Sequence, residues 1–138
     1  GFRQGDRAIM LFTDLMKKKF VTPDAFLGHV GGDDFFLGIR GHSLAEVEGQ
    51  IRDLLTSFRQ DVESFYSPEA REAGHIEVRD RHDEIRRFPL MGVSAAIIEM
   101  PAGERRSVSV DSLSAQFAML KKKAKKECGG YCADRVTE

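Results

Sequence analysis

The feature of this sequence that most constrains its fold is a pair of glycines between two apolar runs. Residues 26–30 precede Gly31 and Gly32, and residues 33–39 follow them. A two-residue hairpin turn of the favoured twist needs positive φ, which glycine adopts without steric cost. The pattern therefore predicts a β-hairpin over residues 26–39 with its turn at Gly31 and Gly32.

Three other segments have the apolar spacing of helices that pack on one face: residues 6–20, a helix that Ser43 opens with a capping box to Glu46, and residues 110–126. Asp6 opens the first of them. The residues expected to face inward are Ala8, Leu11, Phe12, Leu15 and Met16 in the first helix, Leu44, Val47, Ile51, Leu54, Leu55, Phe58, Val62 and Phe65 in the second, and Val110, Leu113, Phe117, Leu120 and Ala124 in the third.

The remaining segments favour strands. Residues 88–98 are small or apolar almost throughout, which predicts a strand buried on both faces, and residues 131–136 predict a short edge strand. Residues 67–88 are highly charged with a few alternating apolar positions, so we expect them to form a hairpin insertion on the surface. Helices alternating with strands predict an α/β fold, an α+β sandwich of helices on a mostly antiparallel sheet.

Length and composition favour one soluble domain over residues 1–138. The length falls below the roughly 150 residues per domain used as a prior, and no apolar run reaches the roughly 18 residues of a membrane span. With 21 basic and 22 acidic residues the net charge is -1, so nucleic-acid binding is not expected. Cys128 and Cys132 are too few for a disulfide scaffold, and we expect free thiols in a reducing cytoplasm.

The hairpin turn and the two acids after it are the segment where chemistry is expected. Gly31 and Gly32 let a phosphate-bearing ligand approach the backbone, with N–H groups facing its oxygens. Asp33 or Asp34 can hold Mg²⁺, which takes one or two protein carboxylates and completes its shell with phosphate oxygens and water. The same residues also fit an ordinary hydrated hairpin tip, and spacing alone leaves both interpretations open.

The segment Gly31-Gly32-Asp33-Asp34-Phe35 resembles the GGDEF signature of the diguanylate cyclase family, with aspartate at the fourth place instead of glutamate. The resemblance extends over nearly the whole chain, through Gly5-Asp6 in the first helix, Val93-Ser94 in the apolar strand and Ala124-Lys125 in the last helix. The form of residues 28–35, together with the charged insertion before residues 88–90, resembles a branch found attached to EAL and CBS modules.

The resemblance implies a ferredoxin-like, cyclase-palm-like sheet and the synthesis of cyclic di-GMP from two GTP molecules, one held by each domain of a homodimer. Asp33 and Asp34 match the family's catalytic and Mg²⁺-binding acids. The positions that match nucleotide-binding residues are Asp6, Gly31, Gly32 and Lys125. Positioning and Mg²⁺ then supply most of the rate acceleration, as in phosphoryl transfer generally.

The chain also departs from the family's pattern. The family's first strand, with a metal-binding aspartate and a guanine-reading asparagine, is absent, so we expect a fragment of a longer protein. Asp34 is one methylene shorter than glutamate, the phosphate-contacting arginine has no counterpart in residues 128–130, and Thr22 and Ala25 replace the product-inhibition motif. His29, where the family often has arginine, is expected to be a strand histidine.

These departures keep a second hypothesis open beside the cyclase: a degenerate, non-catalytic GGDEF domain. Such a domain binds GTP or regulates a neighbouring phosphodiesterase or sensor domain in the same polypeptide.

Overall fold

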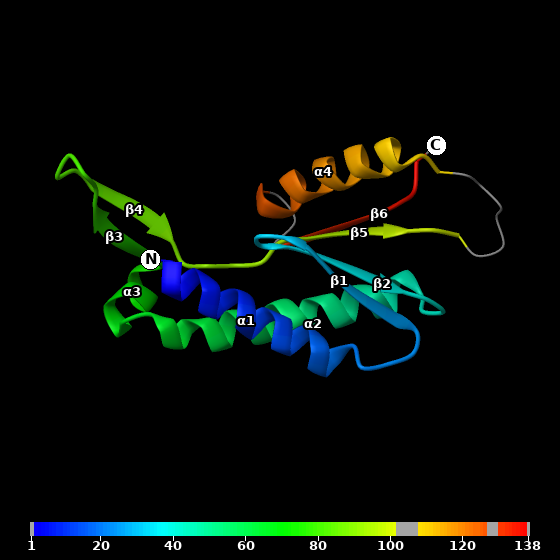
Figure 1. Cartoon of the computed structure of the whole chain (residues 1–138), viewed down its shortest axis with the longest axis horizontal. Helices are drawn as coiled ribbons and strands as arrows, with labels where there is room; N and C mark the ends of the chain where they lie inside the picture. Colours follow the sequence, from blue (N-terminus) through cyan, green and yellow to red (C-terminus); the bar gives the residue numbers. More distant parts are fainter. Residues whose placement is uncertain (1, 102–107, 127–129, 138) are drawn as a thin grey trace.

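The computed structural model describes residues 2–101, 108–126 and 130–137 of the chain (Figure 1). The elements follow one another as α1 (Phe2–Lys19), β1 (Ala25–Gly31), β2 (Asp34–Ile39), α2 (Leu44–Val62), a 3₁₀ turn (Glu63–Phe65), α3 (Pro68–Ala73), β3 (His75–Arg79), β4 (Ile85–Pro89), β5 (Ala95–Glu99), α4 (Val110–Lys126) and β6 (Tyr131–Arg135). The fold is mixed, with helices and small sheets, and this confirms the predicted α+β class.

The elements form layers around a core between α1, α2 and the strands. α1 and α2 lie side by side beneath β1–β2 and β5–β6, and α4 covers the opposite side of β5 and β6 (Figure 1). The buried apolar residues of this core are Ala8, Phe12, Met16 and Phe20 on α1 and Ile51, Leu54, Leu55, Phe58 and Val62 on α2. The apolar faces predicted for the first two helices are therefore confirmed, except that Leu44 is not among the core residues and Phe65 packs against the core from the 3₁₀ turn that follows α2.

Three aromatic rings tie the hairpin to both helices. The ring of Phe12 meets that of Phe35 at 5.1 Å and that of Phe58 at 5.6 Å, in both cases edge to face. Phe12 and Phe58 are buried, and each contributes about 1.5–3 kcal/mol through the apolar surface it removes from water. Phe35 is half-buried, and the edge-to-face pairing adds to the stabilisation. The hairpin is thus fixed on α1 and α2 through its inner face.

The strands pair in three separate two-stranded sheets within the described residues. β1 with β2 and β3 with β4 are antiparallel, whereas β5 with β6 is parallel. The single, mostly antiparallel sheet that the sequence predicts is therefore not formed by these strands alone, because no described strand pairs β2 with β5.

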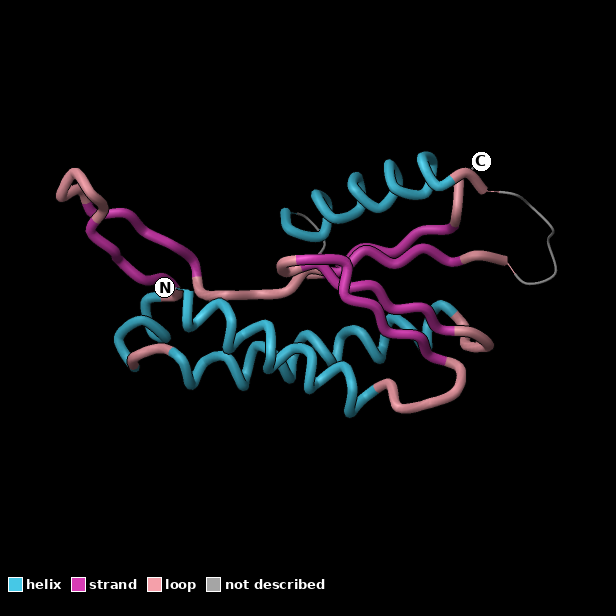
Figure 2. The backbone as a smooth tube through the Cα atoms, viewed as in Figure 1, coloured by secondary structure: helices cyan, strands magenta, loops and turns pink. Residues whose placement is uncertain are grey.

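The charged segment 67–88 contains a helix that the sequence analysis missed. Ser67 caps α3 by accepting a hydrogen bond from Ala70 N at 3.2 Å, Pro68 begins the helix, and Gly74 ends it at φ +76°. The predicted hairpin follows as β3 and β4 and projects away from the helices (Figure 2). Serine followed by proline is a sequence signal for a helix start, so this helix was recognisable.

The predicted strand 88–98 is wrong at its beginning and in its burial. Phe88 and Pro89 end β4, and the next strand, β5, begins only at Ala95. All five residues of β5 are half-buried rather than buried, because one edge of the strand has no partner in the described part of the chain. The edge strand expected at residues 131–136 is confirmed as β6, parallel to β5.

One inward position predicted for the last helix is also wrong. Val110 is 78% exposed, whereas Gln116 is buried together with Leu120 and Ala124. Gln116 can be buried because its amide is hydrogen-bonded: Nε2 donates to the Arg135 carbonyl at 2.6 Å, and Oε1 accepts from Thr137 N at 3.0 Å. A polar side chain with such partners can replace an apolar one in a helix interface.

Candidate functional site

The tip of the β1–β2 hairpin is built differently from the prediction in one respect. Gly31 still belongs to β1 and pairs with Asp34, so the turn consists of Gly32 and Asp33 rather than Gly31 and Gly32. The register gains one residue on β1 between His29 and Gly31, as in a β-bulge. This extra residue moves the turn one position along the chain.

The two glycines are nevertheless needed by the backbone at this tip. Gly31 has φ +153° and Gly32 has φ +56°, and no atom lies within 4 Å of a Cβ built at either position. Glycine is therefore required here by the backbone conformation and not by lack of space, because residues other than glycine disfavour positive φ. Glycine here also leaves the backbone open to approach by a ligand.

His29 braces the turn from within β1, which agrees with its expected place in a strand. The imidazole stacks on the ring of Phe35 at a centroid distance of 4.5 Å. Its Nε2 donates to the carbonyl of Gly32 at 2.8 Å. Because a carbonyl only accepts, this contact requires the proton on Nε2.

The two predicted acids stand at the tip with different surroundings. Asp33 is exposed in the turn, and its side chain has no hydrogen bond or ion pair within the described ranges. Asp34 begins β2, and its Oδ1 lies 3.0 Å from Nζ of Lys121 on α4. The tip therefore presents two carboxylates and one ammonium to solvent.

The other two predicted nucleotide-binding residues are not joined to this cluster by a hydrogen bond or ion pair among the described residues. Asp6 is exposed and lies inside α1, which begins at Phe2; the prediction that Asp6 opens the helix is wrong. Lys125 is exposed on α4, one helical turn beyond Lys121 and near the same end of the helix as the tip (Figure 1).

Sequence reasoning missed Lys121 because it is one of several lysines in the same run. The burial of Leu120 and Ala124 fixes the inner face of α4 and leaves Lys121 at the border of that face. Which lysine reaches the hairpin depends on how α4 packs on β5 and β6, and no local pattern carries that information.

The two carboxylates at the tip are too few to hold a metal ion by themselves, and they can do so only together with a bound phosphate compound. Within the part of the chain that the structure describes, no group of three or more His, Cys, Asp or Glu side chains could hold a metal. Mg²⁺ commonly takes one or two carboxylates and completes its octahedron with water and phosphate oxygens. Asp33 and Asp34 can supply the one or two carboxylates, provided that Asp34 gives up its ion pair with Lys121 and binds the metal instead.

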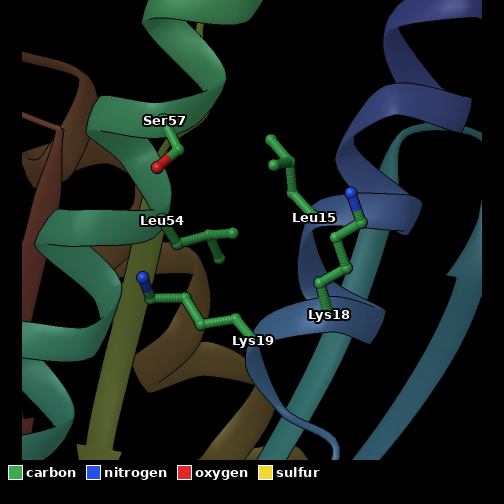
Figure 3. A pocket seen from close by; sticks show the side chains of 5 residues that line it. All are labelled: Leu15, Lys18, Lys19, Leu54 and Ser57. Carbon is green, nitrogen blue, oxygen red and sulfur yellow. The ribbon is translucent and has the colours of Figure 1, made fainter.

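A separate cleft lies between α1 and α2. Leu15, Lys18 and Lys19 of α1 face Leu54 and Ser57 of α2 around a cavity of about 230 Å³ (Figure 3). Among the residues that the structure describes, neither a carboxylate nor a residue of the β1–β2 hairpin lines it. This cleft is therefore distinct from the site that the sequence predicts.

Two remaining expectations concern residues at the edges of the site. Thr22 and Ala25 lie just before and at the start of β1, where Ala25 N donates to the Thr22 carbonyl at 3.2 Å. Of residues 128–130, where the GGDEF pattern has an arginine, Cys128 and Gly129 lie outside the described residues, whereas Gly130 N donates to the Ala124 carbonyl at 3.2 Å. The prediction of two free thiols therefore stays a prediction.

The chain matches no protein-family model, no curated protein and no solved structure. Among the described helices, none has the length and apolar character needed to cross a membrane.

Proposed function

We propose that the protein is a GGDEF-type domain that binds GTP with Mg²⁺ at the β1–β2 hairpin and, facing a second copy, condenses two GTP molecules into cyclic di-GMP. The supporting observation is the exposed tip itself, where Asp33, Asp34 and Lys121 surround a two-glycine backbone. Carboxylates for a metal, an ammonium for phosphate and an open backbone are the groups that a metal–triphosphate needs.

In the proposed reaction the 3′-oxygen of each GTP attacks the α-phosphorus of the other, and each attack breaks one bond to pyrophosphate, so that two pyrophosphate ions leave. Asp33 and Asp34 would hold the metal, and Asp34 would also accept the proton of the attacking hydroxyl. Bound Mg²⁺ stabilises the charge that develops on the phosphate oxygens. The homodimer supplies the second GTP in line with the first, so positioning accounts for much of the acceleration.

We also propose that β1–β2 and β5–β6 belong to one ferredoxin-like, cyclase-palm-like sheet, completed by a further strand between β2 and β5. Leu37 of β2 and Ile97 of β5 pack on the same helical core. Among the described strands, each of β2 and β5 has one partner. Unpaired strand edges beside a core are costly, and a strand at that place would satisfy both.

The second candidate is a degenerate GGDEF domain that binds GTP or regulates a neighbouring phosphodiesterase or sensor domain. The ion pair between Asp34 and Lys121 supports it, because the Asp34 carboxylate has a cationic partner at the place where a metal would need it. In either case we place the domain in the cytoplasm, within a longer signalling polypeptide that carries EAL or CBS modules.

The test is to incubate the full-length protein with GTP and Mg²⁺ and to follow product by mass spectrometry and GTP binding by calorimetry. The cyclase predicts cyclic di-GMP, lost in Asp33→Asn and retained in Asp24→Asn, an exposed aspartate at the opposite end of the hairpin. GTP binding without product supports the regulatory domain instead. If the protein neither binds GTP nor makes product, the result contradicts the cyclase and GTP binding at this site, and leaves only regulation without a nucleotide.

A further inference from the structure

Lys121 links the hairpin tip to α4 across a large separation in sequence. Its Nζ lies 3.0 Å from Oδ1 of Asp34, 87 positions away. Within the described ranges, no other hydrogen bond or ion pair joins the β1–β2 hairpin to α4. The position of α4 relative to the tip is therefore what brings this particular lysine to the acidic rim.

The contact is of a kind that a ligand can replace. The side chains of Lys121 and Asp34 are 44% and 57% exposed, so water screens their attraction and both ions keep much of their hydration. An ammonium group has three donors, and it can move from a carboxylate to a phosphate oxygen by rotating its flexible stem.

We propose that Lys121, rather than Lys125, contacts the phosphates of the bound nucleotide, and that its ion pair with Asp34 closes the metal position until a nucleotide arrives. This inference rests on the proposed function, since it concerns the same hairpin site. Metal and nucleotide then enter together: the phosphates take the ammonium, and Asp34 becomes available to the metal.

Lys121 should affect the binding of a divalent metal alone and the binding of a metal–nucleotide complex in opposite directions. A divalent metal alone must displace Lys121 from Asp34 and meets the positive charge of the displaced ammonium. A metal–nucleotide complex instead gives the ammonium a new anionic partner. Removing the charge of Lys121 should therefore help the metal alone and weaken the metal–nucleotide complex.

The experiment compares Lys121→Gln with Lys122→Gln in the full-length protein. Lys122 is the adjacent, exposed lysine of α4, so the control removes the same charge from the same helix. Binding of Mn²⁺ without nucleotide is followed by the electron paramagnetic resonance signal of the free ion. Binding of GTP with Mg²⁺ is followed by calorimetry.

For Lys121→Gln we expect GTP affinity about tenfold lower, because a charge-assisted hydrogen bond to phosphate is lost, together with tighter Mn²⁺ binding. Lys122→Gln should change neither by as much as twofold. Equal effects of the two variants, or no effect of either, would overturn the role of Lys121 while leaving the proposed function intact. If the unaltered protein binds no GTP with Mg²⁺, the proposed function fails and this inference fails with it.

Discussion

The imidazole of His29 lies parallel to the phenyl ring of Phe35, with centroids 4.5 Å apart and planes inclined by 8°. The two residues are register partners across the β1–β2 hairpin. The stacking holds the imidazole where its Nε2 donates to the Gly32 carbonyl at 2.8 Å. The shape of the turn therefore depends on a residue three positions before it.

Replacing His29 should loosen the tip without unfolding the protein. His29→Ala removes one exposed hydrogen bond and one ring contact, together worth about 1 kcal/mol of local stability. We expect faster amide exchange at residues 31–34 and weaker binding of GTP with Mg²⁺. His42→Ala is the control, because His42 contacts Glu46 at the start of α2 instead. Unchanged exchange at the tip would show that the brace is unimportant.

The glycine at the turn should be sensitive to substitution because of its backbone conformation. Gly32→Ala places a side chain at φ +56°, where an L-residue costs about 1–2 kcal/mol, although the space around it is open. Gly49→Ala, inside α2, should instead stabilise by about 0.5–1 kcal/mol, because alanine loses less entropy in a helix. Urea denaturation of both variants measures the difference, and equal effects would exclude backbone strain at Gly32.

Much of the secondary structure was predictable because local patterns determine it. The apolar faces of α1 and α2 follow from helical spacing, and the Ser43 cap is seen in its contact with Glu46 N at 3.2 Å. The hairpin followed from its glycines, although a one-residue bulge moved the turn. The sequence does not reveal this bulge, because the hairpin with the bulge and the hairpin without it both place Gly31 and Gly32 at or beside the turn.

The features that were not predicted from the sequence depend on tertiary contacts or on local signals that were overlooked. Gln116 is buried because Arg135 at the end of β6 and Thr137 after it supply partners for its amide, and Lys121 reaches the tip because of how α4 packs. Neither follows from spacing along one helix. α3 was different, since Ser67 and Pro68 carried a local signal within a segment whose charge suggested only a hairpin.

The amide of Gln116 should be important for the stability of the α4–β6 interface. Gln116→Leu leaves the Arg135 carbonyl and the Thr137 N–H without their partner, and we expect a loss of about 1–3 kcal/mol in the free energy of unfolding. Gln50→Leu is the matched control, because Gln50 Oε1 is buried without a hydrogen-bond partner in the described structure. Its replacement should leave stability unchanged or raise it. Equal losses would contradict this account.

The loop of the β3–β4 hairpin should open in acid. The N–H of Glu84 donates to the Asp80 carboxylate and lowers its pKa below the ordinary value; the His82 N–H and Arg86 act in the same direction, while burial opposes them. Because folding lowers this pKa, the ionised carboxylate stabilises the loop above its unfolded-state pKa. That contribution is lost as the pH falls through the folded-state pKa.

A pH titration of the His82 and Glu84 amide signals by nuclear magnetic resonance measures this transition. We expect both signals to shift together at a pH below the ordinary pKa of aspartate. Asp80→Asn should remove the transition, whereas Asp83→Asn, which alters only the exposed pair with Arg79, should keep it. A transition that persists in Asp80→Asn would assign it to another group.

The most direct test of the proposed site is to locate the metal on the protein. Mn²⁺ in place of Mg²⁺ broadens the amide signals of nearby residues in a ¹⁵N-labelled sample, recorded with GTP and without it. When GTP is present, we expect broadening of the signals of residues 31–35 and of the end of α4 near Lys121, and we expect Asp33→Asn to abolish it. Broadening confined to other carboxylates, such as Asp61 and Glu63, or unchanged in Asp33→Asn, would contradict the proposed site.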